Sequence, residues 1–401
     1  MPVPRTPGLG FGLFVPPMHK VRSSPTRSLQ RDLELIAYAE TLGFEEAWVG
    51  EHHSGGSEIV GPTEVFLAAA AQRTTRIRLG SGVVSLPYHH PFHVAERAVL
   101  LDHLSMGRSM LGVGPGSLPT DAAMIGVPWG ETRRRMLESW EAVHHLLTSP
   151  EPLTVKTDWF ELRDAALQLA PYSSELPIAF TAMESPFGPS LAGRYGAGLL
   201  SLSATSATGY AALGRHWGVV EEQAAAHGQT VDRRNWRIVT MVHVAETRDQ
   251  ARREVAVGLP GFAAHSAQVS ERTLKWMEAD PDDPAPTAPP TIDELVDGFG
   301  GTRIACIGTP DDAIAMIEAL QAETGGFGSA LLYLGTDWTT PEALHRGLEL
   351  FSREVMPHFQ GSWDALDRSR ERVVATREER LREQRESIEA AGRDYAAKVA
   401  R

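Results

Sequence analysis

The chain of 401 residues contains one cysteine and no hydrophobic run long enough to cross a membrane. A single cysteine, Cys306, cannot form an intrachain disulfide, and this scarcity is typical of a reducing compartment. Cys306 lies in an apolar run, so we interpret it as a small buried hydrophobe and not as a nucleophile. The sequence also has no basic segment followed by an apolar leader, as a signal peptide would have. We therefore expect a cytoplasmic protein with no membrane partner.

Excess positive charge and a dinucleotide-binding fingerprint are missing as well. The formal net charge is -13, and a nucleic-acid partner, which requires a basic face, is not expected. The pattern Gly-x-Gly-x-x-Gly does not occur, so the chain has no NAD(P)H site of that kind. With 42% hydrophobic residues, the chain can bury a large core. A globular enzyme is the default class.

Short apolar runs alternate with amphipathic segments along most of the chain. The runs predict eight buried strands, at residues 9–15, 47–49, 77–86, 109–113, 177–180, 198–202, 236–244 and 330–334. Helices are predicted between them; one spans residues 28–42, with Leu29, Leu33 and Ile36 on one face. Eight strand-then-helix units favour an α/β fold of the (β/α)8 TIM-barrel type, because alternation demands parallel strands and eight of them close. A doubly wound sheet is the alternative.

Two segments break this alternation. Residues 258–301 form an irregular insertion between predicted strands 7 and 8, and its core, residues 281–290, contains five prolines. We expect a lid over the carboxyl face of the barrel, mobile without ligand and without a core of its own. The barrel domain spans residues 1–360. The charged tail, residues 361–401, is predicted to be a solvated helix, with a strap on a partner subunit as the alternative.

The predicted strand at residues 47–49 runs into three side chains that can transfer protons, Glu51, His52 and His53. Chemistry in barrel proteins lies at the carboxyl ends of the strands. Side chains along a strand alternate in direction, so we expect one histidine to face a site and the other to support it. Glu51 either orients His52 or caps the strand end.

A second group of histidines, His89, His90 and His93, raises the question of a metal site. Barrel metallohydrolases usually carry His-x-His at a strand end, and the adjacent histidines here do not match that spacing. The sequence therefore predicts no metal.

Four motifs occur in order along the chain: LGFEEAW at 42–48 with EHH at 51–53, RLGSGVVSLP at 78–87 with HP at 90–91, LDHLSMGR at 101–108, and GTPDD at 308–312. Together they resemble the bacterial luciferase-like flavin monooxygenases, and within that family the limonene monooxygenase-like branch. The resemblance covers most of residues 8–360. It implies that FMN, reduced by a separate NAD(P)H-dependent flavin reductase, reacts with O2 to oxygenate a small hydrophobic organic substrate, terpene-like or a natural-product intermediate. A homodimer is expected.

The same resemblance assigns catalytic residues and the flavin-ring site. His52 matches the active-site histidine of the family, with Glu51 beside it, and a neutral imidazole can accept or return a proton near pH 7. Gly82 and Val83 match the place where the family carries a non-prolyl cis peptide packed against the flavin ring. Gly114, in the turn after the fourth strand, is assigned to cofactor binding.

For the FMN phosphate, the resemblance points to the loop after the fifth strand, with Ser185 as the best side-chain candidate; the assigned residues are Met183, Glu184, Ser185 and Gly188. The luciferases carry an arginine after the fourth strand, where this chain has Pro115. The cation for the phosphate is therefore open, and Arg194 is one candidate.

Two other functions stay open at this point. A deazaflavin-dependent oxidoreductase of the same superfamily is disfavoured by the Glu-His-His motif. A non-catalytic flavin-binding protein is disfavoured by His52 and the full set of strands.

Overall fold

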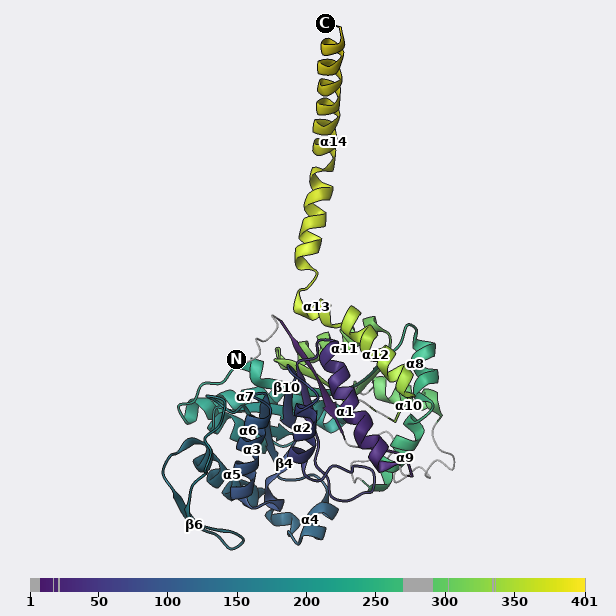
Figure 1. The fold of residues 1–401 in the computed structure, drawn as a ribbon. Helices are drawn as coiled ribbons and strands as arrows, with labels where there is room; N and C mark the ends of the chain where they lie inside the picture. The colour runs from purple at the N-terminus through teal and green to yellow at the C-terminus, as the bar shows by residue number, and fades with distance from the viewer. Residues whose placement is uncertain are drawn as a thin grey trace.

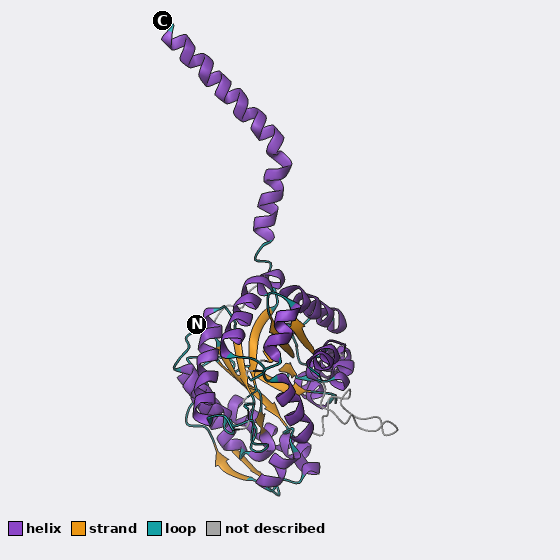
Figure 2. Ribbon diagram, turned by 90° about the vertical axis from the view of Figure 1, so that its right-hand side faces the viewer, coloured by secondary structure: helices purple, strands orange, loops and turns teal. Residues whose placement is uncertain are grey.

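Eight short apolar segments pair side by side and close into a parallel barrel (Figure 2). The computed structural model describes residues 8–16, 18–20, 22–269, 291–301, 303–333, 335 and 337–400. The barrel strands are β1 (Gly10–Val15), β2 (Glu46–Val49), β3 (Arg78–Ser81), β5 (Ser109–Gly114), β8 (Ile178–Ala182), β9 (Gly198–Ser201), β10 (Trp236–Val244) and β12 (Ser329–Tyr333). Each pairs in parallel with the next, and β12 returns to β1. The predicted barrel is confirmed, and the doubly wound sheet is excluded.

Large side chains fill the inside of the barrel, so it is a packed core and not a pore. One buried cluster combines residues from seven strands: Phe14, Trp48, Met110, Ala179, Leu200, Val239 and Leu331. The Trp48 ring needs space from the neighbouring strand, because a Cβ at Gly80 would lie 2.4 Å from it. The glycine on β3 therefore allows the indole on β2 to pack inside.

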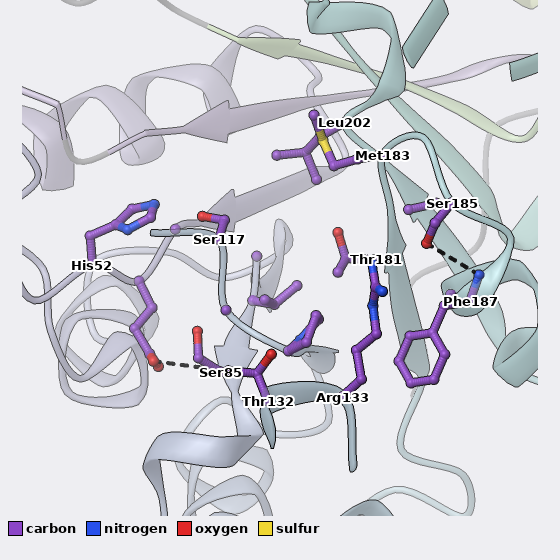
Figure 3. A pocket seen from close by; sticks show the side chains of 18 of the residues that line it. His52, Ser85, Ser117, Thr132, Arg133, Thr181, Met183, Ser185, Phe187 and Leu202 are labelled. Atoms are coloured by element: carbon purple, nitrogen blue, oxygen red, sulfur yellow. Dashed lines mark hydrogen bonds between the residues drawn. The ribbon is translucent and has the colours of Figure 1, made fainter. Parts of the chain in front are cut away.

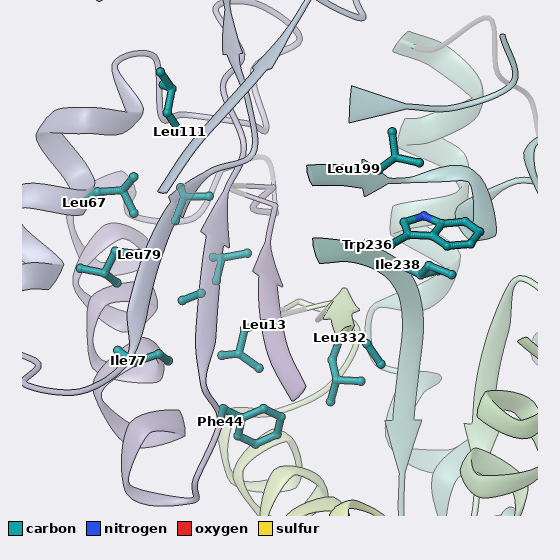
Figure 4. Packing of buried hydrophobic residues seen from close by; sticks show 14 of the residues in the cluster. Leu13, Phe44, Leu67, Ile77, Leu79, Leu111, Leu199, Trp236, Ile238 and Leu332 are labelled. Atoms are coloured by element: carbon teal, nitrogen blue, oxygen red, sulfur yellow. The ribbon is translucent and has the colours of Figure 1, made fainter. Parts of the chain in front are cut away.

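Helices cover the outside of the barrel in the order that the sequence predicts (Figure 1). They are α1 (Pro25–Thr41), α2 (Thr63–Ala71), α3 (Pro91–Leu104), α5 (Thr132–Thr148), α6 (Phe187–Arg194), α7 (Ala207–Ala226), α11 (Pro310–Thr324) and α12 (Pro341–Glu354). Apolar side chains of strands and helices form one large cluster, in which Leu67 of α2 and Leu79 of β3 take part (Figure 4). Short helices in the connections are α4 (Pro119–Ile125), η2 (Trp129–Glu131), η3 (Ser203–Thr205) and η4 (Arg233–Asn235).

A buried ionic cluster stabilises the inside of the barrel at the amino end of β2. The Glu46 carboxylate accepts hydrogen bonds from Arg237 Nε at 2.6 Å, Arg78 Nη2 at 2.5 Å and Trp48 Nε1 at 2.8 Å. Burial raises the pKa of Glu46, but the two guanidinium groups outweigh it and lower the pKa to about 2. Because buried charges require partners, these contacts hold three strands in register away from the carboxyl face.

Two local predictions differ from the structure. The third predicted strand is divided at Gly82–Val83 into β3 and β4 (Val84–Ser85), followed by η1 (Leu86–Tyr88). The stretch after α5, which contains none of the eight predicted strands, forms an antiparallel hairpin of β6 (Leu153–Lys156) and β7 (Glu161–Ala165). Most hairpin side chains are at least partly exposed, which explains the weak hydrophobic signal.

The insertion, residues 258–301, was predicted to be irregular and to lack a core of its own. Its described part is helical, so the first expectation is wrong, and its buried side chains pack against residues outside the insertion. The insertion contains α9 (Leu259–Val269) and α10 (Ile292–Gly301). Two elements flank it, α8 (Arg248–Val255) before it and the extra strand β11 (Ala305–Gly308) after it. Leu259, Leu295 and Phe299 pack with Met241 and Trp338 in a separate buried cluster. The proline-rich core, residues 281–290, lies outside the described residues.

The lone cysteine is buried in β11, with 6% of its surface exposed. Burial raises the pKa of the Cys306 thiol to about 12. A thiol with so high a pKa carries almost no thiolate at neutral pH and is a poor nucleophile. The burial of Cys306 therefore agrees with its interpretation as a small buried hydrophobe and not a nucleophile.

The tail forms one long helix that extends away from the barrel (Figure 1). After α13 (Met356–Gln360), α14 (Asp364–Val399) has no buried residue. Its apolar side chains are sparse and exposed in the single chain. Within the described ranges, no helix combines the length and apolar character that a membrane span requires.

Candidate active site

A cavity of about 480 Å³ opens at the carboxyl ends of the barrel strands (Figure 3). Segments after β2, β3, β5, β8 and β9 contribute to it, together with the ends of β1 and β12 and the start of α5. The lining residues are Phe14, Pro16, Gly50, Glu51, His52, Glu58, Gly82, Val83, Ser85, Pro115, Gly116, Ser117, Trp129, Gly130, Thr132, Arg133, Thr181, Ala182, Met183, Ser185, Phe187, Gly188, Leu202 and Tyr333. The volume suits a cofactor or a drug-sized ligand.

His52 lies at one end of this cavity, with its ring held between two carboxylates. Its Nδ1 is 2.9 Å from Asp121 Oδ2, and its Nε2 is 2.7 Å from Glu58 Oε2. The His52 side chain is 17% exposed, so solvent reaches it only in part. Each ring nitrogen thus has a carboxylate oxygen as its partner, to which it can donate a hydrogen bond. The arrangement can hold a proton and release it at the cavity wall.

Asp121, in the first turn of α4, fixes the loop that carries His52. Its carboxylate also accepts hydrogen bonds from the His53 backbone N–H at 3.1 Å and from Ser54 Oγ at 2.5 Å. Burial raises the pKa of Asp121, but the hydrogen bonds from His52 and Ser54 outweigh burial and hold the pKa below its usual value. Asp121 is therefore the anionic anchor of the loop.

The hypothesis that Glu51 orients His52 does not agree with the geometry. The Glu51 carboxylate accepts hydrogen bonds from His53 Nε2 at 3.2 Å, His89 Nε2 at 3.1 Å and the Ser85 backbone N–H at 3.2 Å. It joins the end of β2 to β4 and η1. Thus His52 faces the cavity and His53 supports the loop, which is the division of roles that strand alternation predicts.

Glu51, His53 and His89 are also the one group in the described ranges whose ligand atoms converge closely enough for a metal ion. The hydrogen bonds to Glu51 occupy the same Nε2 atoms that would coordinate the ion. The hydrogen bond to Glu51 is the largest effect on His53 and raises its pKa, which favours a protonated ring over a neutral metal ligand. We interpret the group as a hydrogen-bond cluster.

The peptide bond between Gly82 and Val83 is cis, and both residues line the cavity. Gly114 does not line it. A Cβ at Gly114 would lie 2.8 Å from a Val83 methyl group and 2.8 Å from the Thr181 methyl group, so this glycine lets Val83 and Thr181 approach each other. Gly114 is therefore not a cavity-lining residue as predicted; it packs beneath two residues that are, Val83 and Thr181.

The far end of the cavity is formed by the loop from β8 to α6. Met183, Ser185 and Gly188 line it, and Ser185 Oγ accepts a hydrogen bond from the Phe187 backbone N–H at 3.4 Å (Figure 3). A Cβ at Gly188 would lie 1.9 Å from the Thr181 carbonyl oxygen, so the helix start packs tightly on β8. Glu184 points elsewhere: its carboxylate is exposed and accepts a hydrogen bond from the Thr208 hydroxyl. Of the four residues predicted in this loop, three line the cavity and Glu184 does not.

Arg133, at the start of α5, was not identified from the sequence, yet its side chain reaches this end of the cavity. Figure 3 shows it beside Ser185 and Phe187, and its guanidinium carbon is 5.9 Å from the centroid of the Phe187 ring. Arg194, the candidate cation from the sequence, does not line the cavity and forms an ion pair with Glu141 at 3.6 Å. Arg133 therefore replaces Arg194 as the candidate cation.

The residues present fit a ribityl phosphate joined to a flat ring. Arg133, Ser185 and the amino end of α6 supply cationic and N–H groups at one end. Val83 and Leu202 supply apolar surface to the cavity wall. The cavity wall thus offers hydrogen-bond donors and a cation for a phosphate, and apolar side chains for a flat ring.

Comparison with known proteins gives a consistent family. The family described as "Luciferase-like monooxygenase" matches residues 9–326. Limonene 1,2-monooxygenase of Rhodococcus erythropolis is 48% identical over 351 residues, which are 88% of this chain and 87% of the relative. 4-Hydroxyprotoasukamycin monooxygenase of Streptomyces nodosus subsp. asukaensis is 44% identical, over 90% of this chain and 95% of the relative.

The fold has solved counterparts. The oxygenating constituent of 3,6-diketocamphane monooxygenase from Pseudomonas putida, a type II Baeyer-Villiger monooxygenase solved in complex with FMN, superimposes with a TM-score of 0.70. It is 24% identical, and the match covers 87% of this chain and 98% of that one. At this identity the match supports the barrel fold alone.

Proposed function

Since the chain belongs to the luciferase-like monooxygenase family, we propose that it is an FMN-dependent monooxygenase that oxygenates a small hydrophobic substrate. The observation that carries the proposal is the polarity of the cavity. A proton-holding imidazole, His52, stands at one end, and a phosphate-binding group of Arg133 and Ser185 stands at the other. Reduced FMN bound along this axis supplies the two electrons that activation of O2 requires.

Arg133, Ser185 and the first turn of α6 would hold the phosphate of FMN. Val83 and Leu202 would hold its ring in the cavity that His52 also lines. Backbone N–H groups and a guanidinium bind phosphate by charge-assisted hydrogen bonds. The same apolar wall excludes water from the reacting atoms.

His52 is proposed to donate the proton that the reaction consumes. One atom of O2 enters the substrate and the other leaves as water; starting from the anionic reduced flavin, one proton has to be delivered. His52 Nε2, shared with Glu58 at 2.7 Å, provides that proton at the cavity wall. Asp121 holds the ring in place on the other side, as an orienting carboxylate does in catalytic triads.

A separate NAD(P)H-dependent flavin reductase is the proposed source of reduced FMN, and a homodimer is the proposed assembly. The absence of a dinucleotide fingerprint from the sequence supports the first of these proposals. The deazaflavin alternative, which uses a different reduced cofactor, remains the second candidate within the same family fold.

The two-component proposal is tested by asking which electron donor, NADH or reduced FMN, the pure protein can use. We expect the pure protein to leave NADH unoxidised in the presence of FMN, and to consume O2 when chemically reduced FMN is added under anaerobic transfer. The measurements are NADH absorbance and an oxygen electrode, with reduced deazaflavin as the parallel arm. NADH oxidation by the pure protein at enzyme-like rates would contradict a separate reductase, and oxygen-independent oxidation of the deazaflavin by substrate would favour the alternative.

A further inference from the structure

A second cavity, of about 410 Å³, adjoins the first at the carboxyl face. Pro16, after β1, and Tyr333, at the end of β12, line both cavities. The outer side of the second cavity is α9, which contributes Gly261 and Phe262. The shared walls place any occupant of the second cavity next to the ring end of the first.

The walls of the second cavity are mainly apolar and aromatic. Phe262 packs edge-on to Trp338, with ring centroids 5.2 Å apart, and edge-on to Tyr333 at 6.4 Å. Met18 and Val257 complete this surface. Lys20 and Thr339 are also in the lining, but apolar and aromatic side chains form the larger part of the wall, so the chamber suits an uncharged, mainly apolar ligand.

Several polar groups at the cavity are already engaged within the protein. The Asp337 carboxylate accepts a hydrogen bond from Arg31 at 2.8 Å, and His19 Nε2 lies 3.1 Å from Asp32. These side chains are therefore committed to structural pairs. Apart from Lys20, His265 and Thr339, the remaining wall is apolar, and it is the main surface available for ligand contact.

The helix α9 is fastened to the proton-handling loop. His265 Nε2 and Ser57 Oγ are 2.6 Å apart, and Ser57 directly precedes Glu58, the partner of His52. The backbone N–H of His19 donates to the Ser57 carbonyl at 2.8 Å. One wall of the second cavity is thus continuous with the residues that hold the proton.

From these contacts we propose that the second cavity is the binding chamber of the organic substrate, and that it takes an uncharged, compact, ring-sized apolar molecule. The inference rests on the proposed function, which places FMN in the first cavity. The substrate contacts Phe262, Trp338 and Tyr333, and it meets the flavin ring across the boundary that Tyr333 and Pro16 share. α9 shields the reacting atoms from bulk water.

Graded filling of the chamber tests the proposal. Gly261 lines the cavity from within α9, and a Cβ there meets no heavy atom within 4 Å, so Gly261→Ala, Gly261→Leu and Gly261→Phe add volume without a backbone clash. The control is Gly218→Leu, on α7, where a Cβ also meets nothing within 4 Å and the residue lines neither of the two cavities. The probe is limonene, measured by equilibrium dialysis with and without oxidised FMN, and FMN affinity is measured by fluorescence quenching.

Limonene affinity is expected to fall with side-chain size, by about 10-fold or more for Gly261→Phe, since overpacking a filled cavity is costly. Gly218→Leu is expected to bind limonene as the unaltered protein does, and every variant is expected to keep its FMN affinity within about 2-fold. Three results would overturn the assignment: no limonene binding to the unaltered protein, equal binding to all Gly261 variants, or loss of FMN together with limonene.

Turnover with reduced FMN separates this inference from the proposed function. Size-dependent limonene binding without any oxygenated product would leave the chamber in place and remove the monooxygenase proposal. Oxygenated product formed equally by Gly261→Phe and the unaltered protein would keep the proposed function and overturn the chamber.

Discussion

Replacement of His52 by alanine is expected to lower product formation about 10²- to 10⁴-fold, the range typical of a lost general acid or base. The ring lies at the cavity wall between Asp121 and Glu58, so its loss removes the proton carrier without opening the apolar core. Stability and FMN affinity should stay within about 1 kcal/mol of the unaltered protein. Oxygen consumed by the variant should then appear as hydrogen peroxide.

The measurement is paired: thermal melting, and the ratio of product to oxygen consumed with chemically reduced FMN. His53→Ala is the matched control, because His53 does not line the cavity and hydrogen-bonds to Glu51, so its loss should act mainly on the melting temperature. A His52→Ala protein that melts as before and keeps both its rate and its product ratio would remove His52 from the mechanism.

Replacement of Arg133 by alanine is expected to weaken FMN binding by about 1–3 kcal/mol, or roughly 5- to 150-fold, the usual cost of losing a charge-assisted hydrogen bond to an anion. The guanidinium stands beside Ser185 at the amino end of α6, where an anion is also favoured by the helix dipole. Riboflavin, which lacks the phosphate, should bind the variant and the unaltered protein alike.

Fluorescence titration with FMN and with riboflavin measures both effects. Arg194→Ala is the control, since Arg194 pairs with Glu141 and does not line the cavity. Equal losses for FMN and riboflavin would mean that Arg133 acts on the cavity shape and not on the phosphate. Unchanged FMN affinity would leave the phosphate without the cation assigned to it.

The barrel was predictable because each strand is buried on both faces and each covering helix on one. Segments such as β10, with nine consecutive buried residues, stand out as apolar runs whatever their partners are. The split at Gly82–Val83 could not be predicted, since β3 and β4 lie in one mainly apolar run, residues 77–86, and the two strands are seen to be separate only from their pairing with β5.

The insertion shows where local patterns fail. Leu259, Leu295 and Phe299 are buried against Met241 of β10 and Trp338 beyond β12, about 20 to 80 positions apart in the sequence. The proline-rich segment, residues 281–290, dominates the composition of the insertion. The buried side chains of the insertion lie before and after that segment. Only the tertiary arrangement reveals that core.

The candidate site was predictable where a strand end carries unusual residues, and not where distant loops meet. His52 follows β2 directly, whereas Asp121 looks like an ordinary acidic residue in the first turn of a helix. Arg133 looks like a solvent-facing residue of α5. Their roles depend on the loops after β5 being folded over the ends of β2 and β8.

The most direct test of the central proposal follows the oxygen atoms. Chemically reduced FMN, the protein and limonene are mixed with ¹⁸O₂ in the absence of any reductase, and the product is analysed by mass spectrometry. The account predicts one ¹⁸O atom in each oxygenated product molecule and the second atom in water. Unlabelled product, or oxidation of all the flavin with hydrogen peroxide as the sole oxygen-derived product, would contradict it.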